Sequence, residues 1–477
     1  MGIRIQRRPL LTDAAVTMSY HPVMHTGAPA DPVSHIDTQP DCNGLRICLL
    51  GYRSHPHVGG QGIYLHYLSK ALVELGHQVD VISGPPYPEL DNRVTLSRLP
   101  SLDLYAVEKP FRALRWRHLR SLTDVYEWWS KISGSFAEPY TFGRRLVHYF
   151  RQQPTRYDII HDNQSLCYGL LKLQQQGLPV VATVHHPITR DLELALASAK
   201  SRGHRWLIKR WYNFLPMQKK VVQQLRHVIT VSEQSRCDIA DAFARSMHKI
   251  QVIPNGIDVD TFKPLPDIQR NPWQLMTTAS SDQPLKGLSV LLRALARLRK
   301  KNPRVSLLVI GKLKPDGATE QELQQLSLCD CVQFVSGISA EDMVKHYAAS
   351  CIAVVPSLYE GFGLPAGEAM ACGIPLVCSD GGALPEVVGN AARLVKAGDV
   401  EDLHQALDDL LQQPAQRALL GRRGREHILQ QLSWSVVAQQ MTAYYRQMLG
   451  QHASAESITP LADNPSTAVV TEAYVND

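Results

Sequence analysis

The sequence predicts an α/β protein made of two Rossmann-like, doubly wound domains that face each other across a cleft. Short apolar runs alternate with longer amphipathic segments, which is typical of parallel strands joined by helices. This alternation occurs in two successive blocks of the 477-residue chain, and glycine-rich turns follow several of the runs. Because open parallel sheets bind ligands at the carboxyl ends of their strands, the functional residues are expected in those turns.

The first block opens with a strand at 46–51, a turn containing Gly60, a helix that closes at Gly76, and a second strand at 78–83. Glycine after a helix is a common C-terminal signal. The turn reads G-G-x-G and departs from the G-x-G-x-x-G of dinucleotide binders, so it gives little support to NAD binding. Three further strands are expected at 157–161, 179–184 and 227–232.

Two stretches of the first block combine basic and aromatic residues. The stretch 103–151 resembles an insertion and carries Trp116, Trp128 and Trp129 among several arginines, and 194–232 contains no Asp or Glu. Basic and aromatic helices suit anionic lipid headgroups, so a weak peripheral membrane contact is expected. A solvated or acceptor-facing surface is the alternative interpretation.

The second block repeats the alternation. Its strands are expected at 275–279, 305–311, 332–337, 351–356 and 375–379. Helices are expected at 288–300 and 340–349, and the stretch 402–449 is expected to be helical. The block therefore predicts a second parallel sheet with its own ligand-binding edge.

The stretch 354–389 carries the most specific chemistry in the chain. A buried strand leads into a loop with Gly361 and Gly363, and Pro365 fits the first turn of the helix that follows. A helix N-terminus at the carboxyl end of a strand suits a phosphate, and glycines let the backbone approach it. Glu360 and Glu368 would then place carboxylates on either side of a bound diphosphate, free to bind hydroxyls.

With these residues the chain resembles the retaining glycosyltransferases of the GT-B fold, also described as glycosyltransferase family 4 or glycosyl transferases group 1. The signature E-x-F-G-x-x-x-x-E stands here as Glu360 to Glu368. The resemblance covers roughly 45–449. It implies that Glu360 contacts the donor sugar and that Glu368 binds the ribose of the nucleotide.

The resemblance implies further site residues. His185, at the end of an expected strand, would contact the donor sugar, with His186 as an alternative register, and Lys286 would bind the diphosphate. The family usually has an arginine five or six residues before that lysine, where this chain has Ser280 and Ser281. Together with His185, Lys286, Glu360 and Glu368, the expected donor contacts are Gly60, Gly337, Gly361, Phe362, Gly363 and Leu364.

The resemblance and the composition together predict five segments. These are a disordered extension at 1–43, an acceptor-side domain at 44–248, a nucleotide-sugar domain at 249–432, a helix crossing back to the first domain at 433–450, and a disordered tail at 451–477. No apolar run reaches transmembrane length, and cysteines in apolar contexts are typical of reduced thiols. The protein is therefore expected in the cytoplasm, with weak contact to the inner membrane face.

The predicted function is that of a hexosyltransferase type of enzyme, which moves a sugar from a nucleotide-diphosphate-sugar donor to an unidentified glycan, lipid or small molecule with retention. A nucleotide-sugar epimerase of the same fold and a non-catalytic nucleotide-sugar-binding protein are the alternatives. No metal or cofactor is expected, because the D-x-D letters of Asp258 and Asp260 lie in the family's N-G-I-D-x-x-x-F loop. The net charge of +6 is mild, and no nucleic-acid partner is expected.

Overall fold

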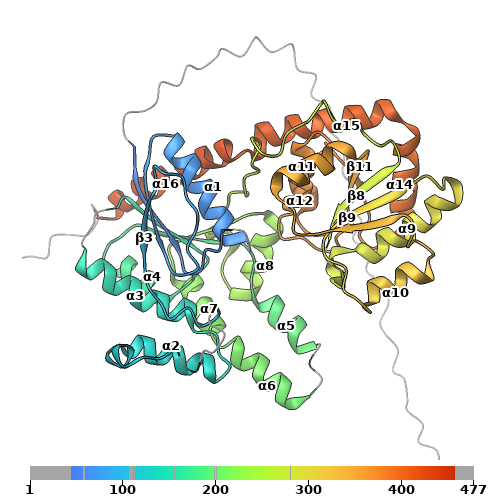
Figure 1. Ribbon diagram of the computed structural model, residues 1–477. Coiled ribbons are helices and arrows are strands. Elements are labelled where there is room, and N and C mark those ends of the chain that lie inside the picture. Colours follow the sequence, from blue (N-terminus) through green and yellow to red (C-terminus); the bar gives the residue numbers. More distant parts are fainter. Residues whose placement is uncertain are drawn as a thin grey trace, which may run out of the picture. The chain divides into compact units, whose positions relative to one another are not determined.

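Two parallel sheets form the framework of the chain in a computed structural model (Figure 1). The structure describes residues 44–56, 60–106, 111, 113–153, 157–197, 199, 201–279 and 281–456. The first sheet has seven strands in the order β3-β2-β1-β4-β5-β6-β7, and the second has six in the order β10-β9-β8-β11-β12-β13. All described strand pairs are parallel, which confirms the α/β class expected from the alternating pattern.

The strands follow the expected apolar runs closely. The first sheet contains β1 (Arg46–Gly51), β2 (Gln78–Ser83), β3 (Thr95–Arg98), β4 (Ile159–Asn163), β5 (Val180–Val184), β6 (His227–Thr230) and β7 (Gln251–Val252). The second contains β8 (Gln274–Thr278), β9 (Ser306–Ile310), β10 (Val332–Val335), β11 (Ile352–Val355), β12 (Leu376–Ser379) and β13 (Arg393–Val395). The short edge strands β3, β7 and β13 were not expected, and β4 lies two residues later than predicted.

Helices connect the strands of each sheet. In the first half they are α1 (Gly60–Glu74), α2 (Leu122–Ile132), α3 (Glu138–Gln152), α4 (Tyr168–Gln175), α5 (Thr189–Ala197), α6 (Arg202–Trp211), α7 (Leu215–Gln224) and α8 (Glu233–Phe243). In the second half they are α9 (Leu288–Lys301), α10 (Ala318–Gln325), α11 (Ala340–Ala349), α12 (Leu364–Ala371), α13 (Leu384–Val388), α14 (Val400–Gln412), α15 (Pro414–His427) and α16 (Trp434–Glu456). Short 3₁₀ segments lie at η2 (Trp116–Arg120), η3 (Met247–Lys249) and η4 (Pro284–Lys286), and a π-helical turn, η5 (Ile428–Leu432), precedes α16.

Successive strand residues point to opposite sides of each sheet, and helices cover both sides, so each sheet is buried on both faces. In β1, Ile47 and Leu49 pack with α1 and α16, whereas Cys48 and Leu50 pack with α3, α4 and α7. The second sheet divides its side chains between two core clusters in the same way. Apolar runs without polar alternation therefore become central strands, and the loops that carry function lie at the strand ends.

The helix α16 packs on the first half of the chain, although it follows the second half in sequence. Its Tyr445 hydroxyl lies 2.6 Å from Nδ1 of His161 in β4, and Thr442 Oγ1 lies 2.9 Å from Nε2 of His77. The helix extends to Glu456, so residues 451–456, expected in a disordered tail, are helical instead. The expected extension at 1–43 and the rest of that tail lie outside the described residues.

Two composition-based expectations can be compared with the described residues. No helix there combines the length and the apolarity that crossing a membrane would require. Eight cysteines are described, and all of them are free thiols. Six of these are buried in the core clusters, as the apolar sequence contexts of several indicated.

Candidate active site

The glycine-rich loop between β11 and α12 is shaped by close backbone packing. Gly363 adopts a φ of +100° at the start of α12, a conformation that strongly favours glycine. The loop after β12 packs against it, because a Cβ atom on Gly382 would lie 2.2 Å from the carbonyl oxygen of Glu360. The backbone N–H of Ala383 donates to that same oxygen at 2.9 Å. Two strand-end loops thus fix the position of Glu360.

The carboxylate of Glu360 is paired with the predicted diphosphate lysine. Nζ of Lys286 lies 2.7 Å from Oε1 of Glu360, and the hydroxyl of Ser357 donates to the same oxygen at 2.8 Å. The turn that carries Lys286 reaches this position because Gly287 packs against the carbonyl of Pro356, where a Cβ would lie 1.9 Å away. The site therefore holds one cation and one anion at the carboxyl end of β11.

Glu368 lies in α12 in a much less polar environment. Burial raises its pKa to about 7, and the negative charge of Asp258 contributes in the same direction. Near neutral pH this carboxyl therefore exists in both its neutral and its ionised form. An ionised Glu368 could accept hydrogen bonds from vicinal hydroxyl groups, such as those of a ribose.

His185 follows β5 and is held in one orientation by its neighbours. Its Nε2 lies 2.8 Å from Oδ1 of Asn163, while Nδ2 of Asn163 donates to the carbonyl of Gln61. The ring of Tyr64 meets the imidazole edge-on at 4.8 Å. Burial lowers the pKa of His185 to about 3, so the ring is neutral at pH 7. Nε2 then carries the proton toward Asn163, and Nδ1 is a hydrogen-bond acceptor.

Gln164 forms hydrogen bonds to the backbone of His185 and His186, and the sequence analysis did not identify it. Its Oε1 accepts from the N–H of His185 at 2.7 Å, and its Nε2 donates to the carbonyl of His186 at 2.9 Å. Gln164 has a φ of +55°, an uncommon conformation for a side-chain-bearing residue. The polar D-N-Q sequence at the end of β4 could have indicated this residue. It was not considered because the strand was predicted to end at His161.

Hydrogen bonds through α8 connect the histidine to the glycine-rich loop. The hydroxyl of Ser235 donates to the carbonyls of Gly361 at 3.0 Å and His185 at 3.3 Å. Ser232, the N-cap of α8, also donates to Gly361. The carboxylate of Glu386 in α13 accepts the N–H groups of Glu233 and Gln234 at 2.6 and 2.9 Å. Residues of both sequence blocks therefore meet around the start of α8.

The remaining predicted donor contacts occupy different environments. Phe362 is buried in a core cluster and Leu364 begins α12, so their side chains contribute to packing. Gly60 begins α1, next to the Gln61 carbonyl that holds Asn163. Gly337 follows β10 at the edge of the second sheet, three strands away from β11. At about 4.8 Å per strand, this places it roughly 14 Å from the strand that leads to Glu360.

Two positions singled out in the sequence have structural partners. The hydroxyl of Ser281 donates to the carbonyl of Lys312 and accepts the N–H of Lys314, both at 2.9 Å, whereas Ser280 lies outside the described residues. Asp258 accepts hydrogen bonds from the hydroxyl of Tyr67 at 2.9 Å and from two N–H groups of its own turn.

Within the described ranges, no three His, Cys, Asp or Glu side chains cluster as a metal site would require.

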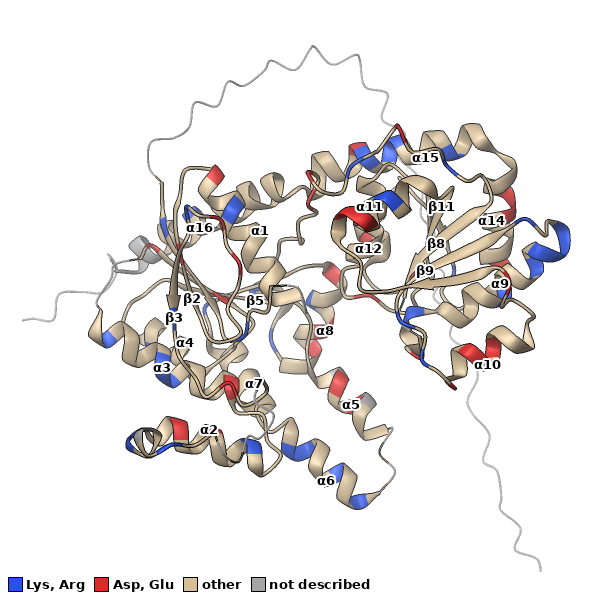
Figure 2. Cartoon of the chain, in the orientation of Figure 1, with Lys and Arg blue, Asp and Glu red and all other residues tan. Residues whose placement is uncertain are grey.

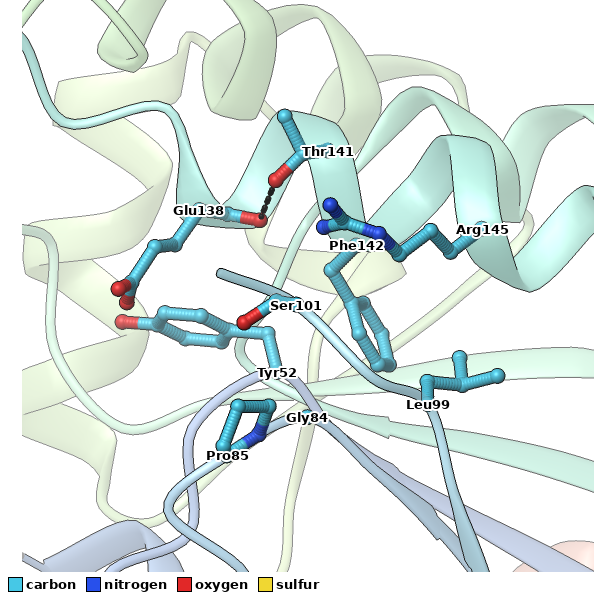
Figure 3. Close-up of a pocket in the computed structure, with 9 residues that line it drawn as sticks. All are labelled: Tyr52, Gly84, Pro85, Leu99, Ser101, Glu138, Thr141, Phe142 and Arg145. Carbon is cyan, nitrogen blue, oxygen red and sulfur yellow. Dashed lines mark hydrogen bonds between the residues drawn. The ribbon is translucent and has the colours of Figure 1, made fainter. Parts of the chain in front are cut away.

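A pocket lies at the carboxyl ends of β1 and β2, where Tyr52 and Glu138 point toward each other (Figure 3). Arg53 pairs with Glu138 through two contacts of 3.1 Å. Burial raises the pKa of Glu138 to about 7, and the Arg53 guanidinium partly opposes that shift. The lining residues are Tyr52, Gly84, Pro85, Leu99, Ser101, Glu138, Thr141, Phe142 and Arg145.

The carboxyl-end loops of the two parallel sheets face each other, Lys286 pairs with Glu360, and Glu368 is partly buried. These features define a GT-B glycosyltransferase. Family comparisons agree, since residues 58–261 match Glycosyltransferase Family 4 and residues 272–427 match Glycosyl transferases group 1. The chain belongs to this family and is a glycosyltransferase.

Individual relatives cover nearly the whole described chain. The chain is 44% identical over 418 residues to MMP alpha-(1->4)-mannosyltransferase of Mycolicibacterium hassiacum, covering 86% of this chain and 100% of that protein. It is 26% identical over 411 residues to D-inositol 3-phosphate glycosyltransferase of Kribbella flavida, covering 81% and 90%. Sucrose-phosphate synthase from Thermosynechococcus elongatus superposes with a TM-score of 0.62 at 25% identity, covering 85% and 100%.

Proposed function

We propose that this enzyme transfers an α-mannosyl group from a nucleoside-diphosphate mannose to the 4-hydroxyl of a mannose-containing acceptor, with retention of configuration. The observation that carries this proposal is the 44% identity to MMP alpha-(1->4)-mannosyltransferase over that protein's entire length. Relatives at about a quarter identity include D-inositol 3-phosphate glycosyltransferases, which makes inositol 3-phosphate the acceptor to test against it.

The environment of the glycine-rich loop supports a nucleoside-diphosphate donor. The diphosphate gains negative charge as its bond to the sugar breaks, and Lys286 together with the N-terminus of α12 supplies positive potential there. Binding would draw the ammonium of Lys286 toward the phosphates while it stays near Glu360, 2.7 Å away in this structure. Glu368 would accept the ribose hydroxyls, and its raised pKa makes that role dependent on pH.

The neutral imidazole of His185 fits a sugar hydroxyl. With Nε2 turned toward Asn163, Nδ1 would accept a hydrogen bond from the donor sugar. In the reaction, the bond between C1 and the diphosphate oxygen breaks, and C1 bonds to the acceptor oxygen on the same face. The acceptor proton passes to the departing diphosphate. Glu360 would stabilise the positive charge that develops at C1.

The test uses purified full-length protein, a panel of nucleoside-diphosphate sugars, and acceptors that differ in their free hydroxyls. We expect transfer from a nucleoside-diphosphate mannose to mannosides with a free 4-hydroxyl, and NMR of the product should show an α-(1→4) linkage. Methylation of that hydroxyl should abolish transfer. Transfer to inositol 3-phosphate in preference to mannosides, a β-linked product, or a donor other than mannose would contradict the proposal.

A further inference from the structure

Large apolar side chains are exposed in one region of the first half. Of the fifteen large hydrophobic side chains that are exposed among the described residues, nine belong to residue 111, η2, α2 and α6. They are Phe111, Trp116, Leu119, Leu122, Tyr126, Trp129, Trp206, Leu207 and Trp211. Trp116 is 87% exposed and Leu122 is 75% exposed, although water is an unfavourable environment for both side chains.

The apolar residues of α2 form a stripe on one helical face. Leu122, Tyr126 and Trp129 recur at i, i+4 and i+7, a spacing that places them on one side of an α-helix. All three are exposed, whereas Glu127 and Ser130 in the same helix are buried. The helix thus turns a polar face toward the protein and an apolar face toward solvent.

The helix α6 continues this exposed surface. None of its residues is buried, yet it contains Trp206, Leu207 and Trp211. It lies beside the end of α2, since Arg210 donates to the hydroxyl of Ser133 at 2.7 Å and its guanidinium lies 5.1 Å from the ring centre of Trp129. Figure 1 shows α2 and α6 next to each other, away from both sheets.

The charges around these side chains are predominantly positive, and Figure 2 shows the basic residues along α6. That helix contains Arg202, Arg205, Lys209 and Arg210 and no acidic residue. The carboxylates of Asp124 and Glu127 in α2 pair with Arg145 of α3 at 2.6 and 2.5 Å. The single guanidinium of Arg145 therefore offsets one of the two carboxylate charges of α2, on the side that faces α3, and the cations of α6 have no acidic residue on their own helix.

We propose that the exposed residues of η2, α2 and α6, together the basic-aromatic surface, dock the enzyme on a bilayer containing anionic lipids. Tryptophan and leucine insert at the boundary between headgroups and acyl chains, and arginine and lysine bind the anionic headgroups. A neutral glycan could stack on the tryptophans but would leave the four cations of α6 without a counterpart. This inference does not depend on the identity of the donor or the acceptor.

Flotation of the full-length protein with vesicles tests the proposal. We expect the protein to float with phosphatidylglycerol and phosphatidylcholine vesicles at physiological salt, and not with phosphatidylcholine alone. Trp206→Ser combined with Leu207→Ser should weaken partitioning by roughly tenfold or more. Arg202→Glu combined with Lys209→Glu should do the same and should reduce the dependence on salt.

Matched changes on α15 and η5 serve as controls. Leu419→Ser with Leu429→Ser removes two other exposed leucines, and Arg422→Glu with Arg423→Glu reverses two exposed charges. Both controls should float like the wild type. Failure of the wild type to float, equal flotation with neutral vesicles, or an equal loss in the controls would overturn the proposal. So would light scattering that shows a wild-type dimer becoming monomeric when Trp206 and Leu207 are replaced.

Discussion

Glu360 and Glu368 have different surroundings, although the motif presents them as a pair. Glu360 accepts a hydrogen bond from the hydroxyl of Ser357 and pairs with Lys286, so its charge is already compensated by polar partners. Glu368 lies in an environment that raises its pKa to about 7. The two carboxylates are therefore suited to different tasks, and their replacement should have different kinetic consequences.

We expect Glu368→Gln to raise the donor KM and weaken nucleoside-diphosphate binding, because bonds to ribose hydroxyls form in the ground state and the transition state alike. Each charge-assisted bond lost costs about 1.5–3 kcal/mol. Glu360→Gln should instead lower kcat and leave nucleoside-diphosphate affinity close to the wild type, because charge develops at the sugar only during reaction. Calorimetry and steady-state kinetics on both variants test this assignment. If Glu360→Gln, and not Glu368→Gln, loses nucleoside-diphosphate affinity, the two roles are reversed.

The pKa of Glu368 predicts a pH dependence of donor binding. Below about pH 7 the carboxyl becomes protonated and loses its charge, so nucleoside-diphosphate affinity should fall as the pH is lowered. His185 should not contribute, since its pKa of about 3 keeps it neutral across this range. Calorimetric titrations from acidic to alkaline pH should show a transition in the wild type that Glu368→Gln lacks. The phosphate groups of the ligand titrate in both proteins and add the same pH dependence to each, so a variant whose affinity changes with pH as steeply as that of the wild type would contradict this assignment.

At the scale of secondary structure elements, the site depends on loops at neighbouring strand ends. Gly382 has a φ of +69°, and a Cβ there would lie 2.2 Å from the Glu360 carbonyl. Gly382→Ala should therefore displace Glu360 and reduce kcat by roughly tenfold or more, with a stability loss of about 1–3 kcal/mol. Gly177→Ala is the matched control, since its φ is +81° but a Cβ would meet nothing within 4 Å. Equal kinetics for the two variants would show that the contact with Glu360 has no role.

The contact of α13 with α8 provides a second prediction for these elements. Glu386→Ala removes the carboxylate that accepts two N–H groups at the start of α8, which should cost about 1 kcal/mol of stability and lower kcat/KM several-fold. Asp399→Ala removes a carboxylate that likewise accepts two N–H groups at the start of a helix, here α14, and should cost similar stability without a kinetic change. Thermal unfolding and kinetics on both variants separate the two effects. A kinetic loss in Asp399→Ala as large as that in Glu386→Ala would show that stability alone accounts for it.

For the whole molecule, we predict donor binding and turnover without a divalent metal. Lys286 and the N-terminus of α12 can supply the positive potential that the departing diphosphate needs. Both carboxylate oxygens of Asp258, in the D-x-D sequence, accept bonds from protein groups. Turnover should therefore persist in EDTA, and Lys286→Ala should reduce it strongly. Complete loss in EDTA with recovery in magnesium or manganese would contradict the prediction.

The sequence alone determined the fold class and the membership of the family. Unbroken apolar runs such as 352–355 favour burial on both faces, and helices on both sides of a parallel sheet provide that burial. The glycines, Pro365 and both glutamates of the motif lie within a single strand, loop and helix, so their relation is local. Local spacing can therefore be interpreted without knowledge of the rest of the chain.

The tertiary structure alone decided which distant residues act together. Asn163 orients His185 across 22 residues, Lys286 reaches Glu360 across 74, and Ser235 reaches Gly361 across 126. Such contacts depend on the order of strands in the sheets and on the packing of α8, which no local pattern encodes. The spacing of the apolar stripe in α2 does not by itself distinguish a core-facing helix from an exposed one. Only the packing around it shows that Leu122, Tyr126 and Trp129 face solvent, because burial depends on which elements surround a helix and not on its own spacing.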